Sequence, residues 1–258
     1  GAEIAARPDG WTWTARTPFG AWTQAVVDAA LARRGLAAAW ARVADTPLPP
    51  APHVRAAELR LAAPELDPAL PRLGDAAVAM DPLSGHGVFW ALSSALHAVP
   101  LIRAILDGET RLAARFHRDR VVETFLRQAR IGRDFHALAG LSAPFWTARA
   151  AWPDDAPAHP APPAAPRLRR RVTVRDGRLA EVEALVTARD PGGVAFVAGR
   201  EIGPILARLG PGPLPDRAAF RARVLPEATA EEADALHDWL VHRGVSAAVP
   251  TLTTEVAT

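Results

Sequence analysis

The sequence contains no cysteine, no lysine and no tyrosine, and it contains only one methionine. The lack of cysteine excludes disulfide bonds, thiolate metal ligands and a cysteine nucleophile. No uninterrupted run of about 18 apolar residues is present, so we expect no membrane-spanning helix. A positively charged and then apolar leader is also missing, which makes the cytoplasm the expected compartment.

Charge and size indicate an ordinary globular protein. All 30 basic residues are arginine, and 28 acidic residues leave a net charge of +2. The arginines are spread along the chain apart from Arg169, Arg170 and Arg171, a pattern that gives little support to nucleic-acid binding. The chain is 49% hydrophobic and 22% charged, and its 258 residues suffice for one large domain or two smaller ones.

Several common catalytic motifs are missing as well. His237 and His242 are separated by five residues, a spacing that places them on different faces of a helix. No Gly-x-Ser-x-Gly elbow and no P-loop occurs in the sequence. We therefore predict no metal site, and neither serine-hydrolase nor P-loop chemistry.

The stretch 72–96, RLGDAAVAMDPLSGHGVFWALSSAL, carries the chemistry that is present. It predicts a strand end at Leu73, a tight turn, a Pro/Gly loop and a long apolar helix. Gly74 allows close approach of the backbone to a ligand because it has no Cβ, and the Asp75 carboxylate can accept hydrogen bonds from hydroxyl groups. The glycines on either side of His86 free the backbone amides to point outward. The start of a helix offers unpaired N–H groups and a positive dipole end, which suit an anion or a carbonyl oxygen.

This stretch resembles the second flavin-binding motif of FAD-dependent monooxygenases of the aromatic hydroxylase and flavin-dependent halogenase superfamily. The resemblance depends on GDAA, DPLSG and GHGV occurring in this order before a helix. It implies that Gly74 and Asp75 hold the ribityl and pyrophosphate region of FAD, and that Pro82 lies near the reactive face of the isoalloxazine ring. The amides implied at the N1–C2 edge of the ring are those of Gly85, His86, Gly87 and Val88. His86 is the candidate for a direct catalytic role, with a structural role as the alternative.

The resemblance implies hydroxylation of an electron-rich aromatic substrate through a flavin hydroperoxide. NAD(P)H or a partner reductase would supply the electrons. Halogenation, which uses a lysine that would have to lie upstream, and saturation of prenyl double bonds are alternative flavin reactions. A non-enzymatic interaction protein built on a decayed flavoprotein scaffold is the alternative outside enzymes.

The same superfamily opens with a strand and a Gly-x-Gly-x-x-Gly turn that binds the ADP pyrophosphate. No such motif precedes Asp75 in this sequence. We therefore expect the sequence to be the C-terminal portion of a longer polypeptide, and a flavin-free descendant is the alternative. On this interpretation the 258-residue fragment alone is inactive and holds FAD weakly or not at all.

A proline-rich linker, residues 151–166, divides the chain into two predicted parts. Residues 1–150 are predicted to be the C-terminal part of an FAD- and substrate-binding region. Its fold class is α/β, with a partial FAD-binding domain of the glutathione-reductase type, an antiparallel substrate-domain sheet and long helices. Residues 167–258 are predicted to form a small α+β domain whose pattern is similar to a winged helix.

The winged-helix similarity bears on the expected partner. Modules of this kind hold peptide leaders in peptide-modifying systems, so residues 167–258 are expected to bind a peptide or protein. The hydroxylated ring would then be a tryptophan or tyrosine of that peptide, and an aromatic small molecule is the alternative substrate.

The remaining elements follow from local patterns. Residues 1–28 are predicted to form antiparallel strands in which Trp11 and Trp13 face the same side. We expect both indoles to belong to the core, with lining of the substrate cavity as the alternative. Before the linker we also predict a helix over 28–44, a strand over 53–61 and a helix from 110 to about 139. After the linker we predict a hairpin that turns at Asp176–Gly177, a strand over 194–197, and helices over 202–209, 217–224 and 230–243. Thr229 and Glu232 form a predicted capping box at the start of the last helix.

Overall fold

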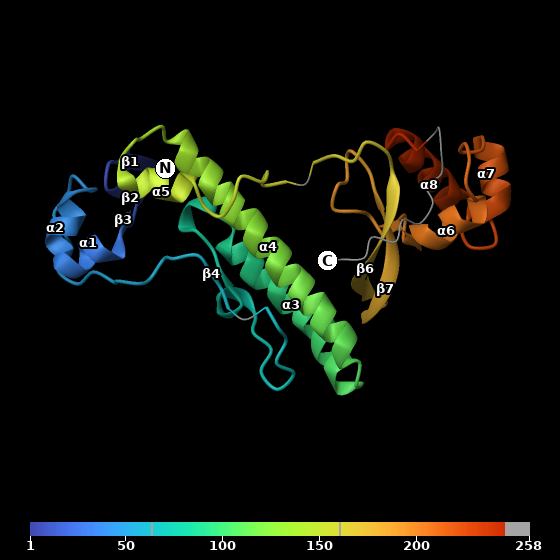
Figure 1. Ribbon diagram of the computed structural model, residues 1–258, viewed down its shortest axis with the longest axis horizontal. Coiled ribbons are helices and arrows are strands. Elements are labelled where there is room, and N and C mark those ends of the chain that lie inside the picture. The colour runs from blue at the N-terminus through green and yellow to red at the C-terminus, as the bar shows by residue number, and fades with distance from the viewer. Residues whose placement is uncertain (63, 160, 246–258) are drawn as a thin grey trace. The chain divides into compact units, whose positions relative to one another are not determined.

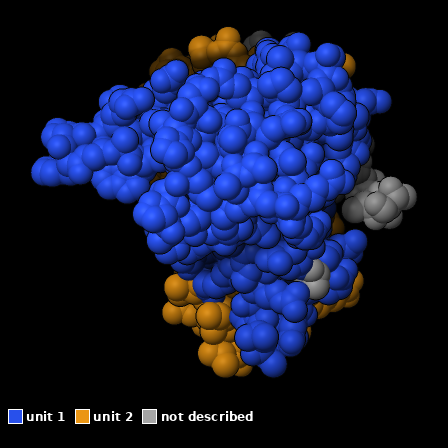
Figure 2. Space-filling view, turned by 90° about the vertical axis from the view of Figure 1, so that its left-hand side faces the viewer, with its two compact units in different colours: residues 1–98, 117–158 blue, residues 99–116, 159–258 orange. Residues whose placement is uncertain are grey.

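A computed structural model describes residues 1–62, 64–159 and 161–245 (Figure 1). The chain divides into two compact units (Figure 2): unit 1 comprises residues 1–98 and 117–158, and unit 2 comprises residues 99–116 and the residues from 159 onward. The predicted class is confirmed in its broad form, because helices are mixed with small sheets. All paired strands in the described ranges are antiparallel. The last residues of the predicted C-terminal domain, 246–258, lie outside the described residues.

Unit 1 begins with a three-stranded antiparallel sheet. Its strands are β1 (Ala2–Arg7), β2 (Gly10–Thr17) and β3 (Gly20–Val27). Trp11 and Trp13 lie two positions apart on β2 and share one face of the sheet, as their alternation predicted. Trp11 is only 3% exposed, which confirms it as a core residue. The expectation that both indoles belong to the core is wrong for Trp13, which is 36% exposed because it lies farther out on the same face.

Two predictions for the following segment are wrong. The helix expected over 28–44 is divided at Gly35 into α1 (Ala29–Arg34) and α2 (Leu36–Ala41). Glycine weakens a helix because it loses the most backbone freedom on folding, and here it ends one helix and begins the next. The strand expected over 53–61 shortens to β4 (Arg60–Leu61), because only these residues pair with β5 (Val78–Ala79).

Long helices follow the flavin-like stretch. They are α3 (Gly87–Leu106), α4 (Thr110–Leu138) and the shorter α5 (Pro144–Ala150). The break between α3 and α4 falls where the sequence predicts it. Gly108 has a φ of +81°, a left-handed conformation that a residue without a Cβ adopts at little cost.

By length and composition, α3 satisfies the criterion for a membrane-spanning helix, although the sequence contains no uninterrupted apolar run of that length. One helix of this kind is a weak indication, since the core helix of a soluble protein satisfies the same criterion. Trp90, Ser94 and Leu101 of α3 are buried inside the protein. The absence of a membrane span therefore stays a prediction.

Unit 2 is built on one hairpin and three helices. Strands β6 (Arg167–Arg175) and β7 (Arg178–Val186) turn at Asp176 and Gly177, both of which have positive φ as in the predicted two-residue turn. The other elements are β8 (Phe196–Val197), β9 (Arg200–Glu201), α6 (Ile202–Leu209), α7 (Arg217–Val224) and α8 (Ala230–His242). The predicted strand over 194–197 is shorter than expected, since Val194 makes only an isolated bridge to Leu185. The capping box of Thr229 and Glu232 is confirmed.

The core of unit 2 joins the hairpin to all three helices. Leu168 and Leu185 of the hairpin pack in one apolar cluster with Ile205, Phe220 and Leu236. The cluster excludes water from the inner faces of α6, α7 and α8, and this burial is the main source of stability for so small a unit.

His117 makes the stability of unit 1 depend on pH. This α4 residue is buried, and burial lowers the pKa of its imidazole. In the unfolded chain the histidine pKa is about 6.5, so the unfolded state binds the proton more readily than the folded state does. The folded state is therefore more stable above that pH, and this stability is lost as the pH falls below it. Replacing His117 with glutamine is expected to make the fall in unfolding free energy between about pH 7 and pH 5 shallower. Some slope should remain, because burial also lowers the pKa of His97. Urea denaturation at each pH measures the effect, and an unchanged slope would contradict it.

Candidate functional site

Gly74 is held by α3 through both of its backbone groups. Its N–H donates to Ser94 Oγ at 2.8 Å, and its carbonyl accepts from Trp90 Nε1 at 3.0 Å. Trp90 and Ser94 are four residues apart, so they lie on the same face of the helix. The expected strand end at Leu73 is not found: Leu73 is extended but unpaired, because Gly74 begins a 3-10 turn, η1 (Gly74–Ala76), with a φ of +53°.

The Asp75 side chain is available to a ligand. It is exposed, and no ion pair of the described residues includes it. Because Asp75 follows Gly74 directly, the two hydrogen bonds from α3 also limit where its carboxylate can lie. The arrangement suits a carboxylate that accepts hydrogen bonds from hydroxyl groups.

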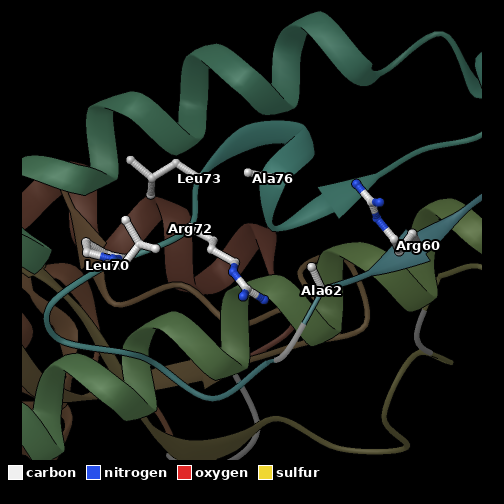
Figure 3. A pocket seen from close by; sticks show the side chains of 7 residues that line it. Arg60, Ala62, Leu70, Arg72, Leu73 and Ala76 are labelled. Atoms are coloured by element: carbon white, nitrogen blue, oxygen red, sulfur yellow. The ribbon is translucent and has the colours of Figure 1, made fainter. Parts of the chain in front are cut away.

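A pocket of about 500 Å³ lies beside this turn in unit 1 (Figure 3). Its lining residues are Arg60, Ala62, Leu70, Pro71, Arg72, Leu73 and Ala76. Leu73 and Ala76 flank the Gly74–Asp75 pair in the chain, so the pocket adjoins this turn. Two guanidinium groups on an otherwise aliphatic lining suit a ligand that carries an anionic group next to an apolar part.

The loop that follows is closed by its own hydrogen bonds. Asp81 caps the 3-10 turn η2 (Pro82–Ser84), with its Oδ1 accepting from the Leu83 N–H at 2.8 Å. Ser84 Oγ donates to the Asp81 carbonyl at 2.8 Å. Gly85 ends the turn in the left-handed conformation, with a φ of +69°. The loop therefore enters α3 in one defined geometry.

The start of α3 offers backbone donors to solvent. The first hydrogen bond of the helix joins the Trp90 N–H to the His86 carbonyl at 2.9 Å, so the amides of the three preceding residues come before the helical ladder. Val88 and Gly85 are exposed, and a Cβ built on Gly85 or Gly87 meets no heavy atom within 4 Å. The open surface and the positive helix end suit an anion or a carbonyl oxygen.

His86 is exposed, but its ring folds back on the loop. Its Nδ1 is hydrogen-bonded to the Ser84 carbonyl, which fixes the orientation of the imidazole. Nε2 is then the ring nitrogen that can reach a ligand. His86 thus has a structural contact, and its predicted catalytic role stays a prediction.

The predicted cofactor residues converge at one end of α3. Gly74 is hydrogen-bonded to Trp90 and Ser94, and Asp75 follows it directly in the chain. The loop and the start of the helix comprise Pro82, Gly85, His86, Gly87 and Val88. The predicted substrate residues belong to the three-stranded sheet, and Leu83 of the loop packs against the cluster that contains Trp11. Trp11 packs in a buried cluster with Phe145 and Trp146, and Trp13 lies farther out on the same sheet face.

Sequence reasoning missed the residues that hold this site in place. Trp90 and Ser94 belong to an apolar stretch in which neither residue stands out as a functional candidate. Their spacing of four residues was the available signal, since it places an indole N–H and a hydroxyl on one helix face. Arg60 and Arg72 had no local signal, because the pocket that they line forms only through folding.

Comparison with solved structures gives the chain a relative of known activity. It is similar to the structure of peptidyl tryptophan dihydroxylase QhpG, essential for tryptophylquinone cofactor biogenesis, with a TM-score of 0.70 and 34% identity over 94% of this chain. The chain spans 60% of the length of that structure. A second structure, the flavin-dependent halogenase CmlS, matches with a TM-score of 0.49 and 15% identity, covering 98% of this chain and 62% of that one. No protein-family model and no curated protein matches the chain.

The dihydroxylase similarity supports the broad class that residues 72–96 predicted. QhpG is, by its description, a peptidyl tryptophan dihydroxylase, and the match covers 94% of this chain. The similarity thus agrees with an oxidoreductase that modifies an aromatic ring.

Proposed function

We propose that this chain is the C-terminal portion of an FAD-dependent monooxygenase that hydroxylates an aromatic ring. The observation that carries the proposal is the meeting of two segments at one end of α3. The Gly74–Asp75 turn is tied to Trp90 and Ser94, and the exposed amides of the loop lie at the start of the same helix. The similarity to a peptidyl tryptophan dihydroxylase supports the same reaction class.

The residues present fit the chemical groups of FAD. Asp75 offers a carboxylate for ribityl hydroxyl groups, and Arg60 and Arg72 offer positive charge for the anionic pyrophosphate. The space above Gly85 and Gly87 leaves room for a flat ring, which a Cβ at either position would partly fill. When bound, FAD supplies the activation of O₂ and the transfer of one oxygen atom to the ring, and the protein supplies binding, orientation and electrostatics.

The start of α3 would act on the cofactor electrostatically. A helix terminus stabilises a nearby opposite charge by about 0.3–1 kcal/mol, and by up to about 2 kcal/mol when partly buried. For a two-electron couple, about 1.4 kcal/mol corresponds to about 30 mV. The amides around Gly87 would therefore favour an anionic reduced ring by tens of millivolts, which tunes the cofactor without replacing its chemistry.

For the substrate we propose a tryptophan side chain within a peptide or protein. The support is the described activity of QhpG. The sequence pattern of residues 167–258, which predicts a peptide-holding module, is consistent with it. A module that holds the peptide would present the reacting indole at high effective concentration. NAD(P)H or a partner reductase remains the proposed electron donor.

Spectroscopy and mass spectrometry of the protein at its full natural length test this proposal. We expect a yellow protein with flavin absorption that adds one or two oxygen atoms to a tryptophan-containing peptide when a reductant is supplied. The same peptide with phenylalanine in place of tryptophan is the matched control and should gain no oxygen. A colourless protein that fails to bind added FAD would overturn the flavin assignment, whereas a yellow protein inactive on every tryptophan peptide would overturn only the substrate.

A further inference from the structure

We propose that His136 and Gly132 of α4 position the Pro82–Ser84 loop by holding the Asp81 carboxylate in place. Asp81 is only 8% exposed, and its two oxygens have different surroundings. Oδ1 accepts the capping hydrogen bond from Leu83, and Oδ2 lies 3.7 Å from His136 Nδ1. A buried carboxylate without polar neighbours is strongly unfavourable. His136 Nδ1 is hydrogen-bonded to the Gly132 carbonyl, and at 3.7 Å from Oδ2 the imidazole is a polar neighbour of the carboxylate without a hydrogen bond to it.

Gly132 brings α4 close enough for this contact. A Cβ at this position would lie 3.3 Å from Asp81 Cβ and 3.4 Å from Asp81 Oδ2, tighter than most real contacts. Gly132 also orients the histidine, since its carbonyl lies 2.8 Å from His136 Nδ1. The two residues are four apart and therefore share the helix face that meets the loop. Together they form a seat for the Asp81 side chain.

The same histidine connects the loop to the three-stranded sheet. Its ring is 2% exposed and packs against Trp146 and Phe145, with ring centroids 5.5 Å and 6.2 Å away. Trp146 Nε1 donates to the carbonyl of Arg7 on β1 at 2.7 Å. Leu83 of the loop packs on this aromatic cluster as well. His136 thus contacts Asp81 of the loop and the two aromatic rings of α5, and the link to the sheet runs through Trp146.

The role assigned to His136 is one of positioning, because it acts through Asp81 on the loop. This inference rests on the proposed function only where it takes the loop to be part of a flavin site. The geometry of the loop is measurable without any cofactor, so the seat can be tested separately from the reaction.

Hydrogen exchange of the loop amides, in the full-length protein without added flavin, is the primary test. We expect exchange at residues 83–89 to become about tenfold faster in His136→Leu and in Gly132→Ala. His136→Leu removes the polar neighbour of the buried carboxylate, and Gly132→Ala displaces the Asp81 side chain by steric contact. His136→Asn retains a polar group that can donate to the Gly132 carbonyl beside Asp81, and it should restore most of the protection. FAD affinity should follow the same order, falling about tenfold in the first two variants.

The matched control is His117→Leu, which removes another buried histidine from the same helix. It should leave exchange at residues 83–89 unchanged even where it lowers the melting temperature. Equal acceleration throughout unit 1 in His136→Leu, or no acceleration in either His136→Leu or Gly132→Ala, would overturn the proposal. If the wild-type protein binds no FAD, the flavin assignment fails, while the exchange result still decides whether the seat exists.

Discussion

Replacing Asp75 with alanine is expected to lower the affinity of the full-length protein for FAD by about 10- to 100-fold. Hydrogen bonds to a charged group contribute about 1.5–3 kcal/mol, which corresponds to a change of this size. Asp75 is exposed and lies beside the backbone of Gly74, which α3 holds from both sides. The loss should therefore reflect ligand contacts, with little change in protein stability. Titration of the apoprotein with FAD, followed by flavin fluorescence, measures the affinity.

A second carboxylate in the same unit provides the control. Asp155 is also exposed, but it lies in the proline-rich segment after α5, away from the motif in the sequence. Asp155→Ala changes the net charge by the same amount as Asp75→Ala and should leave FAD affinity within about twofold, as expected of a surface change. Equal affinities for wild type and Asp75→Ala would remove this residue from the cofactor site.

Truncation of Phe220 is expected to produce the largest loss of stability in unit 2. Its side chain is fully buried in the cluster that joins α6, α7 and α8, and its ring meets His237 edge-on with centroids 5.4 Å apart. Phe-to-Ala changes in a core cost about 3–5 kcal/mol, because buried area is lost and a cavity remains. Phe220→Ala should therefore lower the unfolding free energy of unit 2 by that amount, as measured by urea denaturation monitored by circular dichroism.

Phe19 provides a chemically identical change on the surface. It lies in the turn between β2 and β3 and is 94% exposed. Phe19→Ala should alter the unfolding free energy by no more than about 0.5 kcal/mol. If Phe220→Ala behaves like Phe19→Ala, then the three helices of unit 2 do not share a single cooperative core.

Elements defined by short-range signals were predicted well from the sequence. The helices of unit 2 begin and end close to the expected residues, because caps such as Thr229 and Glu232 act within one turn. The hairpin turn at Asp176 and Gly177 was also predictable, because two adjacent residues determine it. Predictions failed where pairing decided the outcome: most of 53–61 is not a strand, because no neighbouring strand extends beyond Val78–Ala79.

The candidate site shows the same division. The motif residues from Gly74 to Val88 could be identified locally, since their order and types carry the chemistry. The residues that hold them could not, because Asp81 and His136 are far apart in the sequence and meet only after folding. A buried histidine and a glycine within a long charged helix have no distinctive pattern, so only coordinates associate them with the loop.

The two hydrogen bonds between Gly74 and α3 have a thermodynamic consequence for ligand entry. A chain segment that becomes ordered only when its ligand arrives loses conformational freedom at that moment, and this loss reduces the observed affinity. Since Trp90 and Ser94 already restrain the turn, its entropy is lost during folding. Whatever molecule docks beside Asp75 should therefore bind with a small entropic penalty and little rearrangement of the receptor surface.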